Sequence, residues 1–241
     1  VSKEMVLAYH AETLGHLNEA LDRYRALAEE GRGSDQIGAL NRYIFAMQRK
    51  HGQTNGLKAE VERLKAKSHK TDFEWMFLSE FGSEIDPRSC YREVVANPSS
   101  PFAAYAKMKL VFHYDPRETT DVKAFARKTM ADLQSFIHEH PLDAFVDHAK
   151  LRIASCLEEN GEDNAAIDIY RRLLQTGDLL VRAHCIHNLS KAHLVHAPAL
   201  VQNARMIAQF YGEWGDGYFM PDGFDPERVT IDIPQLTTTD E

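Results

Sequence analysis

Two stretches of the chain repeat one another and decide the fold. Residues 97–110 read NPSSPFAAYAKMKL, and residues 140–153 read HPLDAFVDHAKLRI, at an offset of 43 positions. Pro, Phe, Ala and Lys are identical between the two, and the apolar positions are kept. A further amphipathic stretch, 179–195, holds Ala183, which lies 34 residues after Ala149. Because a fixed period of about 20–50 residues is typical of stacked repeats, we expect a repeated helical unit.

A second pattern occurs twice and indicates helix hairpins. Gly, Ala, Tyr and Leu, spaced five, four and three residues apart, are found as Gly15, Ala20, Tyr24 and Leu27, and again as Gly161, Ala166, Tyr170 and Leu173. Glycine permits a tight turn between antiparallel helices, alanine lets them approach closely, and the two larger side chains fill the seam one and two turns further on.

With these features the chain resembles the tetratricopeptide-repeat (TPR) family, whose helix-turn-helix units of about 34 residues carry a small residue, an aromatic residue and a closing proline. Pro98 and Pro141 stand where that proline belongs, and the resemblance covers about residues 87–211. It implies an all-α fold of antiparallel helix hairpins, stacked as a right-handed TPR-like solenoid. We therefore expect degenerate N-terminal hairpins at 1–86, TPR-like repeats at 87–211 and an acidic, aromatic, non-helical tail at 212–241.

Hydrophobic periodicity predicts the helices in detail. The expected ranges are 3–14, 17–30, 34–51, 56–68, 71–82, 87–96, 100–113, 121–139, 144–159, 163–175, 179–195 and 199–211. Ser34 and Thr71 are the expected N-caps. The aromatic stripe Phe73, Phe77 and Phe81 is expected in the core. Alternating residues at 228–233 are the one candidate strand.

Composition and charge exclude several classes of protein. The 241 residues are 44% hydrophobic and 27% charged, which excludes a wholly disordered chain. No apolar run reaches the roughly 18–20 residues of a membrane span, and residues 1–30 lack an export signal. We expect no direct membrane insertion and a cytoplasmic location, or a periplasmic one if an upstream leader was removed. Residues 212–241 carry a net charge of −7 and leave −1 for the rest of the chain.

The sequence contains few features that are typical of catalytic or metal-binding sites. There is no phosphate-binding loop, nucleophile elbow or zinc-protease motif. Cys90, Cys156 and Cys185 read as buried free thiols. One helix cannot gather His184, His187, His193 and His196 around a single ion, because the last two lie on the opposite face. Seven bases between residues 49 and 70 read as a solvated helix face. We expect no catalytic residue, no metal, no cofactor and no nucleic-acid partner.

We therefore expect a non-catalytic protein-interaction scaffold or adaptor that is one subunit of a larger hetero-complex. It would bind a partner helix or extended peptide in an apolar concave groove. The resemblance places nine residues on that groove: Tyr105, Met108, Phe112, His148, Leu151, Ser155, Arg182, Cys185 and Leu189. We expect the tail to dock on the body or on a partner through Trp214, Tyr218, Phe219 and Phe224. The alternative is an enzyme or metal-binding protein whose site is assembled from dispersed His, Asp and Glu residues.

Overall fold

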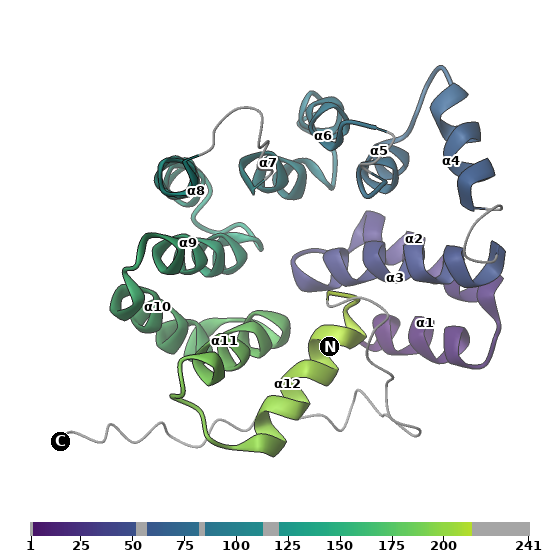
Figure 1. Cartoon of the computed structure of the whole chain (residues 1–241). Helices are drawn as coiled ribbons and strands as arrows, with labels where there is room; N and C mark the ends of the chain where they lie inside the picture. Colours follow the sequence, from purple (N-terminus) through teal and green to yellow (C-terminus); the bar gives the residue numbers. More distant parts are fainter. Residues whose placement is uncertain (1, 52–56, 82–84, 113–120, 214–241) are drawn as a thin grey trace.

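The structure is a computed structural model, which describes residues 2–51, 57–81, 85–112 and 121–213. Within these ranges it contains twelve α-helices and no strand (Figure 1). The helices are α1 (Lys3–Thr13), α2 (Leu17–Glu30), α3 (Ser34–His51), α4 (Leu57–Ala66), α5 (Asp72–Ser79), α6 (Pro87–Val95), α7 (Ala103–Phe112), α8 (Val122–Glu139), α9 (Val146–Asn160), α10 (Asp163–Thr176), α11 (Leu179–Lys191) and α12 (Pro198–Phe210). The predicted all-α class is confirmed for this part of the chain.

Local capping explains where several helices begin. Thr71 caps α5 with a reciprocal capping box, in which its side chain accepts from the backbone N–H of Glu74 and the Glu74 side chain accepts from the backbone N–H of Thr71. The prediction that Ser34 is an N-cap is wrong, because Ser34 is itself the first residue of α3 and its hydroxyl bonds elsewhere. The expected strand at 228–233 lies outside the described residues.

Successive helices pack on one another as hairpins, and one hairpin design occurs twice. The turns after α1 and α9 place Gly15 and Gly161 at φ of +80° and +81°, a conformation that favours glycine. In the first unit the Tyr24 hydroxyl donates to Glu12 at 2.8 Å, and in the second the Tyr170 hydroxyl donates to Glu158 at 2.9 Å. The same contact, at the same spacing from the same glycine turn, joins the two helices of both hairpins.

The two ends of the described chain meet, so the helices follow one another around a closed ring (Figure 1). The end of α12 packs on α1 through the rings of Phe210 and Tyr9, whose centroids are 5.2 Å apart. The Tyr211 ring lies directly over Gly38 in α3, and the Asn41 side chain donates to the Tyr211 carbonyl at 3.2 Å. The ring is closed by both aromatic packing and hydrogen bonds.

One continuous hydrophobic core runs through the ring, from Met5 in α1 to Tyr211 after α12. Phe73 and Phe77 are buried in it and Phe81 packs against it, as the aromatic stripe predicts. The three cysteines are free and buried, which confirms the interpretation of the sequence. None of the described helices is both long enough and apolar enough to cross a membrane.

Candidate functional site

Most residues expected on the concave groove are buried in the structure. Tyr105, Met108, Cys185 and Leu189 are at most 2% exposed, and His148 is 8% exposed. Leu151, Ser155 and Arg182 are partly exposed. Phe112 belongs to α7, but its side chain lies outside the described part of the structure, as do the four tail residues Trp214, Tyr218, Phe219 and Phe224.

The start of α3 helps to cover this inner face. Gln36 donates through Nε2 to the carbonyl of Pro101, in the α6–α7 loop, at 3.1 Å. Gly33, at φ of +58°, lies so close to the α8–α9 loop that an added Cβ would be 3.3 Å from the Ala144 carbonyl oxygen. The start of α3 therefore contacts the α6–α7 and α8–α9 loops, which an open array of hairpins would leave accessible to a partner.

Ser34 joins α3 to two further helices through polar contacts. Its Oγ lies 3.0 Å from Nε2 of His148 in α9 and donates to Oδ2 of Asp178 at 2.5 Å. Desolvation opposes ionisation of Asp178, but the nearby imidazole of His148 and the hydrogen bond from Ser34 outweigh it and hold the pKa of Asp178 below its usual range. Serine and carboxylate both face the same His148 nitrogen, whereas a catalytic triad places them on opposite nitrogens. The geometry is that of a clamp that holds α3, α9 and the start of α11 together.

The buried aromatic residues behave as core residues. The Tyr105 ring stacks on Phe145 with centroids 5.3 Å apart and planes 16° apart, and Lys109 Nζ lies 5.4 Å from the Tyr105 ring centroid. Burial raises the pKa of Tyr105, and burial also raises the pKa of Cys185 to about 12. Neither group is poised to ionise near neutral pH, so neither is a candidate nucleophile.

A hollow of about 1060 Å³ opens where three connections between hairpins meet. These connections are the α2–α3 turn, the α6–α7 loop and the α8–α9 loop, which face one another because α2 and α3 point across the ring toward α7 and α9 (Figure 1). The two loops are the start of the repeated stretches quoted above, 97–102 and 140–145. Sequence periodicity indicated that these loops are equivalent, but it did not indicate that they enclose a common space.

The hollow is lined by both apolar and polar residues. Ala103, Ala104 and Phe136 contribute to the wall, and Leu142, which is 97% exposed, contributes at its edge. Gln36 also lines the hollow and is fully buried. Sequence reasoning missed Gln36 and Leu142, because a glutamine within a helix and a leucine in a loop carry no motif.

The Gln36 amide has one acceptor without a donor. Its Nε2 donates to the carbonyls of Ala28 at 2.8 Å and Pro101 at 3.1 Å. This fixes the orientation of the amide, because a flip would place an oxygen against two carbonyl oxygens. Its Oε1 is buried and has no hydrogen-bond partner among the described residues. A buried acceptor without a partner costs about 1–3 kcal/mol, so a donor brought into this position would be favourable.

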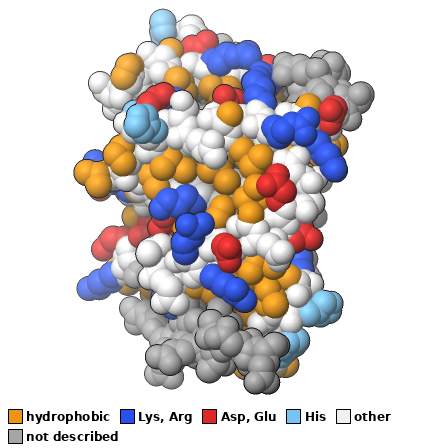
Figure 2. All heavy atoms as spheres, turned by 90° about the vertical axis from the view of Figure 1, so that its left-hand side faces the viewer, with side chains coloured by type: hydrophobic (Ala, Val, Ile, Leu, Met, Phe, Trp, Pro, Cys, Tyr) orange, Lys and Arg blue, Asp and Glu red, His pale blue; other side chains and the backbone are white. Residues whose placement is uncertain are grey.

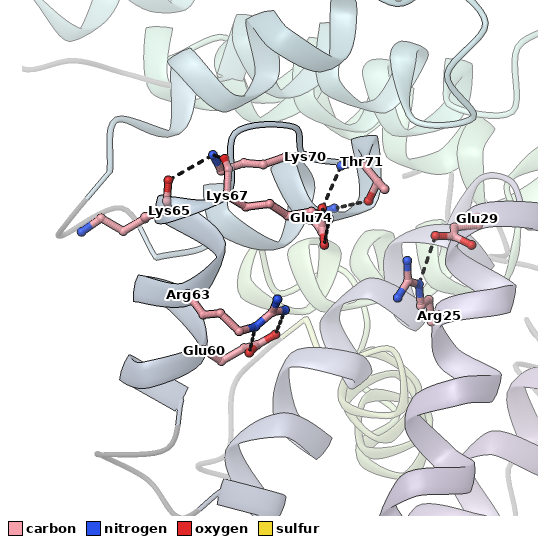
Figure 3. A network of polar contacts seen from close by, with 9 residues as sticks. All are labelled: Arg25, Glu29, Glu60, Arg63, Lys65, Lys67, Lys70, Thr71 and Glu74. Carbon is pink, nitrogen blue, oxygen red and sulfur yellow. Dashed lines mark hydrogen bonds and ion pairs between the residues drawn. The ribbon is translucent and has the colours of Figure 1, made fainter.

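Several bases of the stretch 49–70 are paired with groups of the same chain (Figure 3). Arg63 donates to Glu60 at 2.7 Å and Lys67 to Glu74 at 2.8 Å. The hydrogen bond from Arg63 lowers the pKa of Glu60. Lys70 instead donates to the carbonyls of Lys65 and Lys67 at the end of α4. These pairings reduce the positive charge that α4 and the α4–α5 connection present to a ligand.

Metal ligands are not gathered within the described ranges, where no group of three or more His, Cys, Asp and Glu residues could hold an ion. His184 faces Glu213, with Nε2 and Oε2 separated by 3.9 Å, and burial lowers the pKa of His184.

The outer face that carries α8, α9 and α10 has hydrophobic side chains in its middle, bordered by Lys and Arg (Figure 2). Partly buried side chains on these three helices include Met130, Ile137, Leu157 and Ile169, all of which pack against the core. This packing accounts for their position without a ligand.

The chain was compared with known proteins. No protein-family model matches it, and neither the curated proteins nor the solved structures gave a match.

Proposed function

We propose that the protein is a non-catalytic scaffold of TPR-like helix hairpins, arranged as a right-handed solenoid that closes into a ring, and that it holds a partner protein within a larger assembly. Partner binding is assigned to the hollow between the α2–α3, α6–α7 and α8–α9 connections. The single observation that carries this assignment is the open hollow of about 1060 Å³, lined by both apolar and polar residues, beside an almost fully exposed leucine, Leu142.

The repeated hairpin supports the TPR-like architecture. Gly15 and Gly161 adopt the same left-handed turn, and each turn precedes a tyrosine that bonds to a glutamate twelve positions earlier. A stack of such hairpins presents loops along one rim, and loops on a rigid scaffold commonly carry binding residues.

Burial of the inner face favours the hollow over the concave groove as the binding surface. Tyr105, Met108, Cys185 and Leu189 are already packed within the chain, so a partner would have to displace core contacts to reach them. Leu142 needs no such rearrangement. Apolar side chains at the edge of a pocket supply affinity when a partner removes them from water.

The test compares two exposed leucines in the intact chain, expressed in its native source. A photo-crosslinking amino acid replaces Leu142 in one variant and Leu14, which is 71% exposed at the α1–α2 turn, in the other. We expect one defined protein to be crosslinked from position 142 and not from position 14. Leu142→Glu should abolish its co-purification, whereas Leu14→Glu should leave it unchanged. Equal behaviour of the two positions would contradict the proposal.

A further inference from the structure

We propose that the hollow recognises a cationic segment of the partner, in which an arginine or lysine lies next to an apolar side chain. This inference rests on the proposed function and specifies the chemistry of the partner at the same site. It is carried by two acceptors at the hollow that have no donor among the described residues, the buried Oε1 of Gln36 and the exposed carboxylate of Glu30.

Several donors at the hollow are already used within the chain, although the exposed Arg32 is a further donor there. The N–H of Phe102, just before α7, donates to Ser100 at 3.2 Å, and the N–H of Phe145, just before α9, donates to Asp143 at 2.8 Å. Lys107 is held by Glu139 at 2.9 Å. Proline residues in the two loops contribute carbonyl groups and have no N–H to offer.

Two acceptors at the hollow have no donor within the described part of the chain. The buried Oε1 of Gln36 has no donor among the described residues, although Gln36 lies on the wall of the hollow. Glu29 and Glu30 both lie at the C-terminal end of α2, whose last turn contains no base. A helix C-terminus is the negative end of the helix dipole, so these carboxylates make this corner electronegative. Arg25 pairs with Glu29 at 3.2 Å, which leaves Glu30, exposed and facing the hollow, for a ligand.

A cationic side chain fits both features. Arginine carries five N–H donors and lysine three, and neither carries an acceptor, so either can donate to these two acceptors. The neighbouring apolar residue of the segment would pack on Ala104 and Leu142. Arg32, also at the hollow, repels a cationic ligand and therefore provides an internal control of opposite sign.

The experiment uses the full chain labelled with ¹⁵N and three end-blocked octapeptides of equal apolar content. The peptides carry two arginines, two glutamates or two glutamines at the same positions. We expect the arginine peptide alone to shift the amide signals of Gly31, Ala104 and Leu142 in a saturable titration. Its affinity should fall as salt is raised from 50 to 300 mM, because these charges are partly exposed.

Three charge variants then test the assignment by fluorescence anisotropy with the same arginine peptide. Glu30→Gln should weaken binding about two- to five-fold, as expected for one partly exposed charge pair. Arg32→Gln should strengthen binding by a similar factor. Glu93→Gln, which removes an exposed carboxylate of α6 outside the hollow, should leave binding unchanged.

Each alternative outcome overturns either the inference or the proposed function. Saturable binding of the glutamate peptide at the same amides, shifts that map away from the hollow, or equal effects of Glu30→Gln and Glu93→Gln would each show that the cationic assignment is wrong. If no peptide binds while native complexes still depend on Leu142, the partner's chemistry is wrong and the proposed function stands. If the arginine peptide binds but no native complex depends on Leu142, the proposed function fails instead.

Discussion

The buried carboxylate of Glu12 offers the sharpest test of how the N-terminal hairpin is held to α3. Glu12 is 1% exposed and accepts from Tyr24 at 2.8 Å, from Arg42 Nη2 at 2.6 Å and from Arg49 at 3.1 Å. Glu12→Gln would leave the guanidinium of Arg42, only 12% exposed, without its counter-ion. Removal of one partner from a buried ion pair costs about 3–5 kcal/mol.

The second copy of the hairpin supplies a matched control. Glu158 accepts from Tyr170 at 2.9 Å in the same geometry but is exposed, so Glu158→Gln should cost at most about 1 kcal/mol. At about 2–4 °C per kcal/mol for a chain of this size, thermal unfolding followed by circular dichroism should show a Tm lowered by about 6–20 °C for Glu12→Gln and by less than about 4 °C for Glu158→Gln.

A double variant separates the unpaired charge from other effects of the substitution at Glu12. Adding Arg42→Met to Glu12→Gln removes the uncompensated cation, so the double variant should recover part of the lost stability. Equal losses for Glu12→Gln and Glu158→Gln, or no recovery in the double variant, would refute the reasoning.

Three further predictions concern ring closure and pH. Gly38→Ala should lower the free energy of unfolding by about 1–3 kcal/mol despite the better helix propensity of alanine, because the new methyl would overlap the Tyr211 ring. Urea titration measures this change, and a variant that is more stable than the original chain would contradict the packing. Gly33→Ala should cost more than Gly15→Ala in the same assay, since both residues have positive φ but only Gly33 abuts another loop. Burial, Lys191 and Arg205 lower the pKa of His187 from 6.5 to about 4. Between these two pH values the folded state therefore binds fewer protons than the unfolded state, and the free energy of unfolding should fall as the pH drops from 6.5 to 4. His187→Gln should flatten that slope in urea titrations, and an unchanged slope would show that the burial of His187 does not control it.

Local patterns predicted the helices well, because the start, end and buried face of a helix depend on residues that are neighbours in sequence. The range expected at 17–30 is α2 itself, and Thr71 caps α5 as its capping-box sequence indicates. The expected helix at 179–195 ends earlier, at Lys191, because His193 adopts a positive φ of 58° and turns the chain. Since histidine rarely takes this conformation, the sequence carried no sign of the turn.

Contacts between distant segments could not be predicted in the same way. Ser34 is of a residue type that is common at N-caps, and only the fold shows that its hydroxyl binds His148 and Asp178 more than a hundred positions away. One sign was available in the sequence. Glu12 and Tyr24 have the same separation as Glu158 and Tyr170, with glycine at the same place between them. If glutamate had been included in the repeated pattern, the sequence would have predicted the Glu–Tyr contact in both hairpins.

Closure of the ring also determines where the hollow lies. An open array of hairpins exposes the inner faces of its first helices, and Tyr105 and Met108 are the kind of side chains that a partner would cover there. In this chain the start of α3 contacts the α6–α7 and α8–α9 loops, and Tyr105 and Met108 belong to the core. Closure also brings the α2–α3 turn opposite the α6–α7 and α8–α9 loops, which creates the hollow. The contacts that bury these side chains are therefore also the contacts that form the hollow, to which we assign partner binding. A substitution that opens the ring, such as Gly38→Ala, should weaken partner binding at Leu142 even though Gly38 does not line the hollow.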